Sequence, residues 1–119
     1  MTNQELHDEL LKRVPEFSGT NFYHKDEMER PYNFVSFFGQ YLKKTIDDYL
    51  QSKDSAKLDI IKRGLEFANT LFDTEDSELM NIANMEVLEY FEESPEAVGL
   101  ALRYLNNPAS QALKKSLSE

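Results

Sequence analysis

Apolar side chains recur at intervals of three and four residues through most of the chain, and this spacing places them along one face of an α-helix. The second helix illustrates the pattern, with Val35, Phe38, Leu42 and Ile46 in register. In total the pattern predicts six helices, which cover approximately residues 2–14, 31–51, 55–72, 75–93, 95–105 and 108–117. No stretch of useful length alternates between apolar and polar residues as a half-buried strand does.

Capping residues and prolines mark where these helices begin. Thr2 followed by Glu5 has the spacing of a capping box, in which each side chain hydrogen-bonds the backbone N–H of the other residue. Pro31, Pro95 and Pro108 stand at the first turn of a helix, where a missing N–H breaks no hydrogen bond. The side chains expected to cap the other helices are Asp54 or Ser55, Asp73 and Thr74, Ser94 and Asn107.

Residues 15–30 lack a helical apolar period and carry Gly19 among polar and charged residues, so we expect a long irregular connection there. The other connections are very short, which makes consecutive helices antiparallel neighbours. The sequence therefore predicts an all-α fold, with five to six antiparallel helices in a closed bundle or a short stack of helical hairpins. Residues 1–119 are expected to form a single helical domain.

Acidic side chains concentrate in one part of the chain. Residues 64–102 contain ten carboxylates and no Lys or Arg, whereas the rest of the chain has 12 acidic and 13 basic side chains. The formal net charge of −9 at pH 7 therefore arises within this stretch. Such a balance argues against nucleic acid or an anionic membrane as a partner, because both would repel the chain. The acidic stretch therefore either binds a basic partner protein or only keeps the protein soluble.

The acids of this stretch fall into two groups. Those of residues 73–78 are explained by the start of a helix, where capping and the helix dipole favour carboxylates, and the segment lacks the glycine and final glutamate of a calcium loop. Glu86, Glu89 and Glu93 are expected to share one helix face. The second group, which has no countercharge one helical turn away, comprises Glu86, Glu89, Glu92, Glu93 and Glu96.

Three interpretations of this second group remain open: a solvated outer face, a docking surface for a basic partner, and a site for a divalent metal ion. Bundles that bind two metal ions through carboxylates also use histidine, and residues 64–102 contain none. We interpret the five glutamates as the candidate partner-binding site.

Residues typical of catalytic and cofactor sites are scarce. The chain has no cysteine, no glycine-rich phosphate loop, no dinucleotide motif and no serine in a nucleophile elbow. Its two histidines, His7 and His24, are expected at the surface without a positioned partner. No apolar run is long enough for a signal-peptide core or a membrane helix. We therefore expect a cytoplasmic protein that is not an enzyme and that has no cofactor and no membrane or nucleic-acid partner.

Aromatic side chains and asparagines add two further features. Eight of the 14 aromatic residues lie between Phe17 and Tyr41, where we expect them to form a core, with a homodimer interface or a ligand groove as the alternatives. Asn69, Asn81 and Asn84 lie close to the apolar helix faces, either as satisfied buried amides or as a polar recognition patch.

The tract LEFANTLFDTEDSELMNIANMEVLEYF, residues 65–91, contains the pattern Asn-Ile-x-x-x-Glu-x-Leu. It resembles a group of small, uncharacterised, all-helical bacterial proteins in which this pattern opens a central helix. The resemblance covers about a third of the chain and brings no catalytic residues with it. It implies a helical, HEAT-like, non-enzymatic protein.

The leading functional hypothesis is a protein-interaction module. Its acidic face, from the fourth helix into the start of the fifth, would meet a basic surface, as an immunity protein or antitoxin does when it blocks a toxin that binds nucleic acid. The alternative is a small-ligand-binding protein or minor enzyme that uses the aromatic-rich region of the second helix together with Tyr23 and His24.

Overall fold

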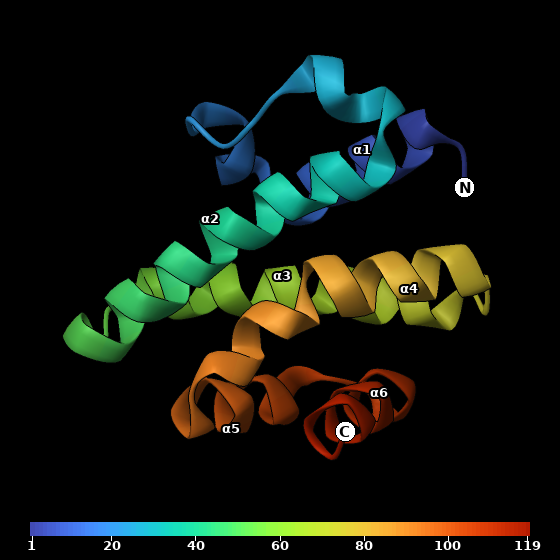
Figure 1. The fold of residues 1–119 in the computed structure, drawn as a ribbon. Coiled ribbons are helices and arrows are strands. Elements are labelled where there is room, and N and C mark those ends of the chain that lie inside the picture. Colours follow the sequence, from blue (N-terminus) through green and yellow to red (C-terminus); the bar gives the residue numbers. More distant parts are fainter.

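Helices make up nearly the whole molecule (Figure 1), and the computed structural model describes all residues, 1–119. The α-helices are α1 (Asn3–Arg13), α2 (Pro31–Ser52), α3 (Ser55–Asp73), α4 (Ser77–Glu86), α5 (Pro95–Tyr104) and α6 (Asn107–Leu117). Three short 3-10 helices accompany them, η1 (Pro15–Gly19), η2 (Lys25–Glu29) and η3 (Leu88–Glu93). There are no strands, so the predicted all-α class is confirmed.

The central helix is α3, which packs against each of the other five α-helices. In Figure 1 it runs behind α2 through the middle of the molecule, with α1 above it and α5 and α6 below. Consecutive helices α2, α3 and α4 run in alternating directions, as the short turns between them require. The buried apolar side chains form one continuous cluster of 26 residues, to which all six α-helices contribute.

Several helix starts agree with the predicted caps. The Thr2 hydroxyl accepts a hydrogen bond from the backbone N–H of Glu5 at 3.0 Å, and the Glu5 carboxylate accepts one from the N–H of Thr2 at 2.8 Å. Asp54 caps α3 and Ser94 caps α5, each through its side-chain oxygen. Spacing along the sequence was sufficient to predict these caps, because a cap contacts only the next two or three residues.

The caps of α4 and α6 are not the predicted ones. Asp76 caps α4, because the Thr74 hydroxyl instead donates to the carbonyl of Leu71 at the end of α3. Glu75, with φ of 58°, makes the left-handed turn between the two helices. Asn106, one residue before the predicted Asn107, caps α6 by accepting from the N–H of Ala109.

The predicted fourth helix divides in two. It was expected to continue to residue 93, but α4 ends at Glu86, Val87 leaves helical geometry and η3 follows. The break lies against α2, because Gly39 of α2 packs directly against the Glu86 carbonyl and the Tyr90 ring. Leu88 and Phe91, both fully buried, are three residues apart, and this spacing suits a 3-10 turn as well as an α-helix.

The connection of residues 15–30 is more ordered than the sequence suggested. It contains η1 and η2 and is fastened by Phe17, which is fully buried against the rings of Phe34 and Phe38. Arg63 of α3 also holds the connection in place through hydrogen bonds. It donates to the backbone carbonyl of Arg13 at 2.9 Å and to the Glu16 carboxylate at 2.8 Å. The aromatic side chains near the start of α2 thus pack within the molecule, as the core interpretation expected.

None of the helices combines the length and the apolar character that are needed to cross a lipid bilayer.

Candidate functional site

The five glutamates singled out in the sequence do not lie on one helix. Glu86 is the last residue of α4, Glu96 lies in the first turn of α5, and the other three belong to η3. Because the α-helix ends at Glu86, the prediction that Glu86, Glu89 and Glu93 share one helix face is wrong. In the structure the five glutamates have different surroundings.

Glu93 and Glu96 have basic side chains near them. Lys43 of α2 forms an ion pair with Glu93 at 3.1 Å, and this hydrogen bond and the charge of Glu93 raise the pKa of the Lys43 ammonium. Glu96 lines a hollow together with Lys53 and Arg103. Lys43 and Lys53 come from α2 and its end, far from these glutamates in the sequence, so spacing along the chain did not show them.

Glu86, Glu89 and Glu92, which we call the acidic trio, differ from these two, and among them only Glu89 shares a hollow with a basic side chain, Lys115. None of the three forms an ion pair with Lys or Arg. The hydroxyl of Ser116 in α6 donates a hydrogen bond to Glu92 at 2.9 Å. Partial burial, followed by the charges of Glu92 and Glu86, raises the pKa of the Glu89 carboxyl. The folded chain therefore holds Glu89 as a carboxylate at some cost in stability.

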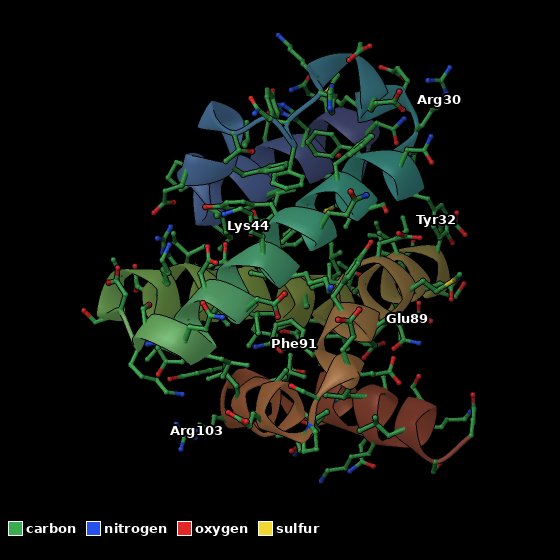
Figure 2. All side chains as sticks on the ribbon, turned by 60° about the vertical axis from the view of Figure 1, so that its left-hand side comes forward. Arg30, Tyr32, Lys44, Glu89, Phe91 and Arg103 are labelled. Carbon is green, nitrogen blue, oxygen red and sulfur yellow. The ribbon has the colours of Figure 1, made fainter.

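Next to the acidic trio, a hollow of about 440 Å³ opens between α4 and α6, and we call it the α4–α6 hollow. Figure 2 places Glu89 on η3, at the gap between these two helices, whereas Phe91 lies inside the molecule. The lining combines apolar, neutral polar and charged side chains, namely Phe72, Ser77, Met80, Asn81, Asn84, Glu89, Ala112, Lys115, Ser116 and Glu119.

The three asparagines near the apolar faces have different roles. Asn69 donates to the carbonyl of Tyr104 at 3.0 Å and accepts from the N–H of Asn106 at 2.9 Å. Asn81 donates to the hydroxyl of Tyr32 at 2.9 Å. In contrast, Oδ1 of Asn84 is buried and accepts no hydrogen bond, and it is the only buried side-chain polar atom left in that state. The amides of Asn69 and Asn81 thus link different parts of the fold, whereas the Asn84 oxygen has no hydrogen-bond partner.

Two other hollows are present. One, of about 290 Å³, lies between the end of α2 and α5, where the exposed Arg103 of Figure 2 and Lys53 stand beside Leu50 and Leu100. The other lies along α1 and is bordered by Met1, three acids and Lys12. Neither Tyr23 nor His24 lines any of the three hollows.

The two histidines are placed differently from each other. His7 is buried, not on the surface as predicted, and its ring nitrogens lie 3.0 Å from an Asp8 oxygen and 2.7 Å from the Tyr23 hydroxyl. This chain of hydrogen bonds holds the connection against α1. His24 is exposed, as predicted, and its ring packs on Phe37. No group of three or more His, Asp or Glu side chains is arranged to hold a metal ion.

One known protein family matches nearly the whole chain. Residues 7–118 match a family described as "Domain of unknown function (DUF7674)". No curated protein and no solved structure matches the chain. The matched range contains α2 to α6 entirely, and with them the acidic trio and all but the last residue that lines the α4–α6 hollow. The chain belongs to the DUF7674 family of domains of unknown function.

Proposed function

We propose that the protein is a non-enzymatic interaction module that uses the acidic trio and its surroundings to bind a basic surface on a partner protein. The observation that carries the proposal is the unpaired state of the trio, since three carboxylates lie close enough together for two of them to raise the pKa of the third. Like charges held together reduce the stability of the fold. A basic partner would supply the missing countercharge.

The surroundings strengthen the same electrostatic character. Four further acids, all exposed, lie at the end of α3, in the turn that follows it and at the start of α4, namely Asp73, Glu75, Asp76 and Glu78. The chain from residue 64 to residue 102 supplies no basic side chain to this side of the molecule. A surface of one sign accelerates association with a partner of the opposite sign and discourages acidic competitors.

The chemistry of the surface describes a class of partner. A protein that binds nucleic acid presents clustered Lys and Arg side chains, and an acidic protein that covers them blocks its function. We therefore place the protein with immunity proteins and antitoxins in its mode of action. The alternative, a ligand site in the aromatic region, receives less support, because the Tyr23 hydroxyl is engaged by His7 and the His24 ring packs on Phe37.

The test compares two variants with the same net charge. One carries Glu86→Lys, Glu89→Lys and Glu92→Lys, and the control carries Asp26→Lys, Glu29→Lys and Asp47→Lys, which are exposed acids elsewhere on the surface. Each triple substitution changes the formal net charge from −9 to −3, because each of the three replacements adds two charges.

Immobilised wild-type protein and both variants are exposed to lysate of the native host, and the captured proteins are quantified by mass spectrometry. We expect a basic protein that the wild type and the control capture and the trio variant does not. With the purified partner, the association rate should fall with rising salt for the wild type and depend much less on salt for the trio variant. Equal capture by the wild type and the trio variant would refute the proposal.

A further inference from the structure

Two side chains on the α4–α6 hollow make the folded protein less stable than it could be. Asn84 contains the only buried side-chain polar atom without a hydrogen-bond partner, and Glu89 is partly desolvated and repelled by two other carboxylates. Buried polar groups in native proteins are nearly always paired, so an unpaired one calls for an explanation. Residues that reduce stability without a structural role are typical of binding sites. Both of these residues line the same hollow.

The two residues require the same chemistry from a ligand. A carboxylate accepts hydrogen bonds and attracts positive charge, and the unused oxygen of Asn84 is also an acceptor. This oxygen is buried, but the terminal torsion of an asparagine is soft. A half-turn of the amide would therefore bring Oδ1 to the hollow. The ligand should be a positively charged group with several hydrogen-bond donors.

The rest of the lining suits an aliphatic stem behind that charged group. Phe72 is buried at one side of the hollow, and Met80 and Ala112 are half-buried beside it. Lys115 also lines the hollow, but it is exposed and forms no ion pair, so it can turn towards solvent. Against its single positive charge stand Glu89 and Glu119 in the lining, with the rest of the acidic trio adjacent.

We propose that the α4–α6 hollow binds an arginine side chain of the partner, with the guanidinium between the Glu89 carboxylate and the Asn84 amide and the stem on Phe72 and Met80. This inference rests on the proposed function and names its anchoring contact. A guanidinium presents five N–H donors in a planar fork and can therefore bond both groups at once. The ammonium of lysine is a compact point charge and fits two separated acceptors less well.

The first experiment uses a small probe, Nα-acetyl-arginine amide, and its citrulline analogue, which has nearly the same shape but no charge. Each is titrated into isotope-labelled protein and followed by NMR. The arginine probe should shift the side-chain amide signals of Asn84 and the backbone signal of Glu89 saturably, with a Kd on the order of 1 mM. The citrulline probe should not. The absence of saturable shifts, or equal shifts with both probes, would overturn the inference.

Three variants test which residues make the contact. Glu89→Gln and Asn84→Leu should each weaken binding of the arginine probe by about tenfold. The control Glu75→Gln removes an exposed acid that does not line the hollow and should leave the Kd unchanged. Neither test variant should melt at a lower temperature than the wild type, so lost binding could not be attributed to unfolding. Equal weakening by Glu75→Gln would indicate diffuse charge attraction and contradict the inference.

The captured partner separates this inference from the proposed function. If the trio variant loses the partner but Asn84→Leu and Glu89→Gln bind it normally, the function stands and the arginine contact is wrong. If the arginine probe binds the hollow but the trio variant retains the partner, the hollow is a site and the proposed acidic docking surface is wrong.

Discussion

Asn84 and Asn69 form a matched pair at the scale of single residues. Replacing Asn84 by leucine removes a buried acceptor that has no partner, so we expect the free energy of unfolding to rise by about 1 kcal/mol. Replacing Asn69 by leucine breaks hydrogen bonds at both ends of its amide, leaves the carbonyl of Tyr104 without this donor, and should lower it by about 2 kcal/mol. Urea unfolding of both variants measures the two changes. Changes of the same sign would show that Asn84 is satisfied in solution.

Glu89 and Glu16 should respond to pH in opposite directions. Partial burial and the charges of Glu92 and Glu86 raise the pKa of Glu89 above its ordinary value of 4.5, so its ionised form destabilises the fold at neutral pH. We expect Glu89→Gln to be more stable than the wild type by up to about 0.5 kcal/mol at pH 7, a small effect because the side chain is largely exposed. This gain should disappear as the pH falls through the raised pKa towards 4.5.

The pKa of Glu16 is shifted in the opposite direction from that of Glu89. The hydrogen bond from Arg63 lowers the pKa of the Glu16 carboxyl below the ordinary 4.5. The ion pair therefore stabilises the fold above pH 4.5, and its contribution is lost as the pH falls through the lowered value. Glu16→Gln should be less stable by about 1 kcal/mol at pH 7 and equal to the wild type at strongly acidic pH. Thermal unfolding across the pH range tests both variants, and parallel pH profiles would contradict these assignments.

Residue roles were predictable only where the partner is a near neighbour in sequence. The capping box of Thr2 and the caps formed by Asp54 and Ser94 follow from spacing. The burial of His7 depends on Tyr23, 16 residues away and positioned by the connection. Likewise, the sequence offered Asn69 and Asn84 in equivalent settings, and only the fold decides which amide finds partners. The structure was needed to narrow the candidate site from five glutamates to three, and to single out Asn84 among the three asparagines.

At the scale of helices, Gly39 lets α2 pack closely against the Glu86 carbonyl at the end of α4. A Cβ at position 39 would overlap that oxygen and the Tyr90 ring, so Gly39→Ala should force α2 away from the α4–η3 junction. We expect a loss of about 3 kcal/mol, at the upper end of what overpacking costs. Calorimetric melting measures this loss.

Gly99 provides the matched control, because it lies within α5 and a Cβ there would contact nothing within 4 Å. Gly99→Ala should stabilise the protein by about 0.5–1 kcal/mol through the better helix propensity of alanine. If Gly39→Ala were tolerated as well as Gly99→Ala, close packing could not be the reason for glycine in α2.

The same junction shows where helix prediction fails. Five of the six helices could be located from periodicity and caps because their apolar faces and boundaries are encoded locally. The end of α4 at Glu86 is not encoded in this way, since the apolar residues on either side of Val87 fit α- and 3-10-helical spacing alike. Contact with α2 decides between them. The break in turn brings Glu89 to the α4–α6 hollow rather than to a continuous acidic helix face.

At the scale of the whole molecule, the acids and bases are distributed unevenly in space as well as in sequence. Ion pairs such as Arg13–Glu9, Lys44–Asp48 and Arg63–Asp59 involve residues outside the acidic part of the chain or at its border. The concentration of charge was predictable from composition, because it requires only counting. The pairing of Lys43 with Glu93 was not, because α2 and η3 meet only in the folded chain.

This distribution makes the salt dependence of stability a test of where the repulsion lies. Added salt screens like charges, with a Debye length of about 10 Å at 0.1 M, so the melting temperature of the wild type should rise with NaCl. Salt also weakens the surface ion pairs, but each contributes only about 0–1 kcal/mol. The triple Lys variant of the acidic trio and its control variant have the same net charge of −3, from −9 plus six. If repulsion within the trio dominates, the salt-induced rise in melting temperature should shrink much more in the trio variant than in the control. Equal reductions would mean that total charge alone governs the effect, and that the trio has no special electrostatic strain for a partner to relieve.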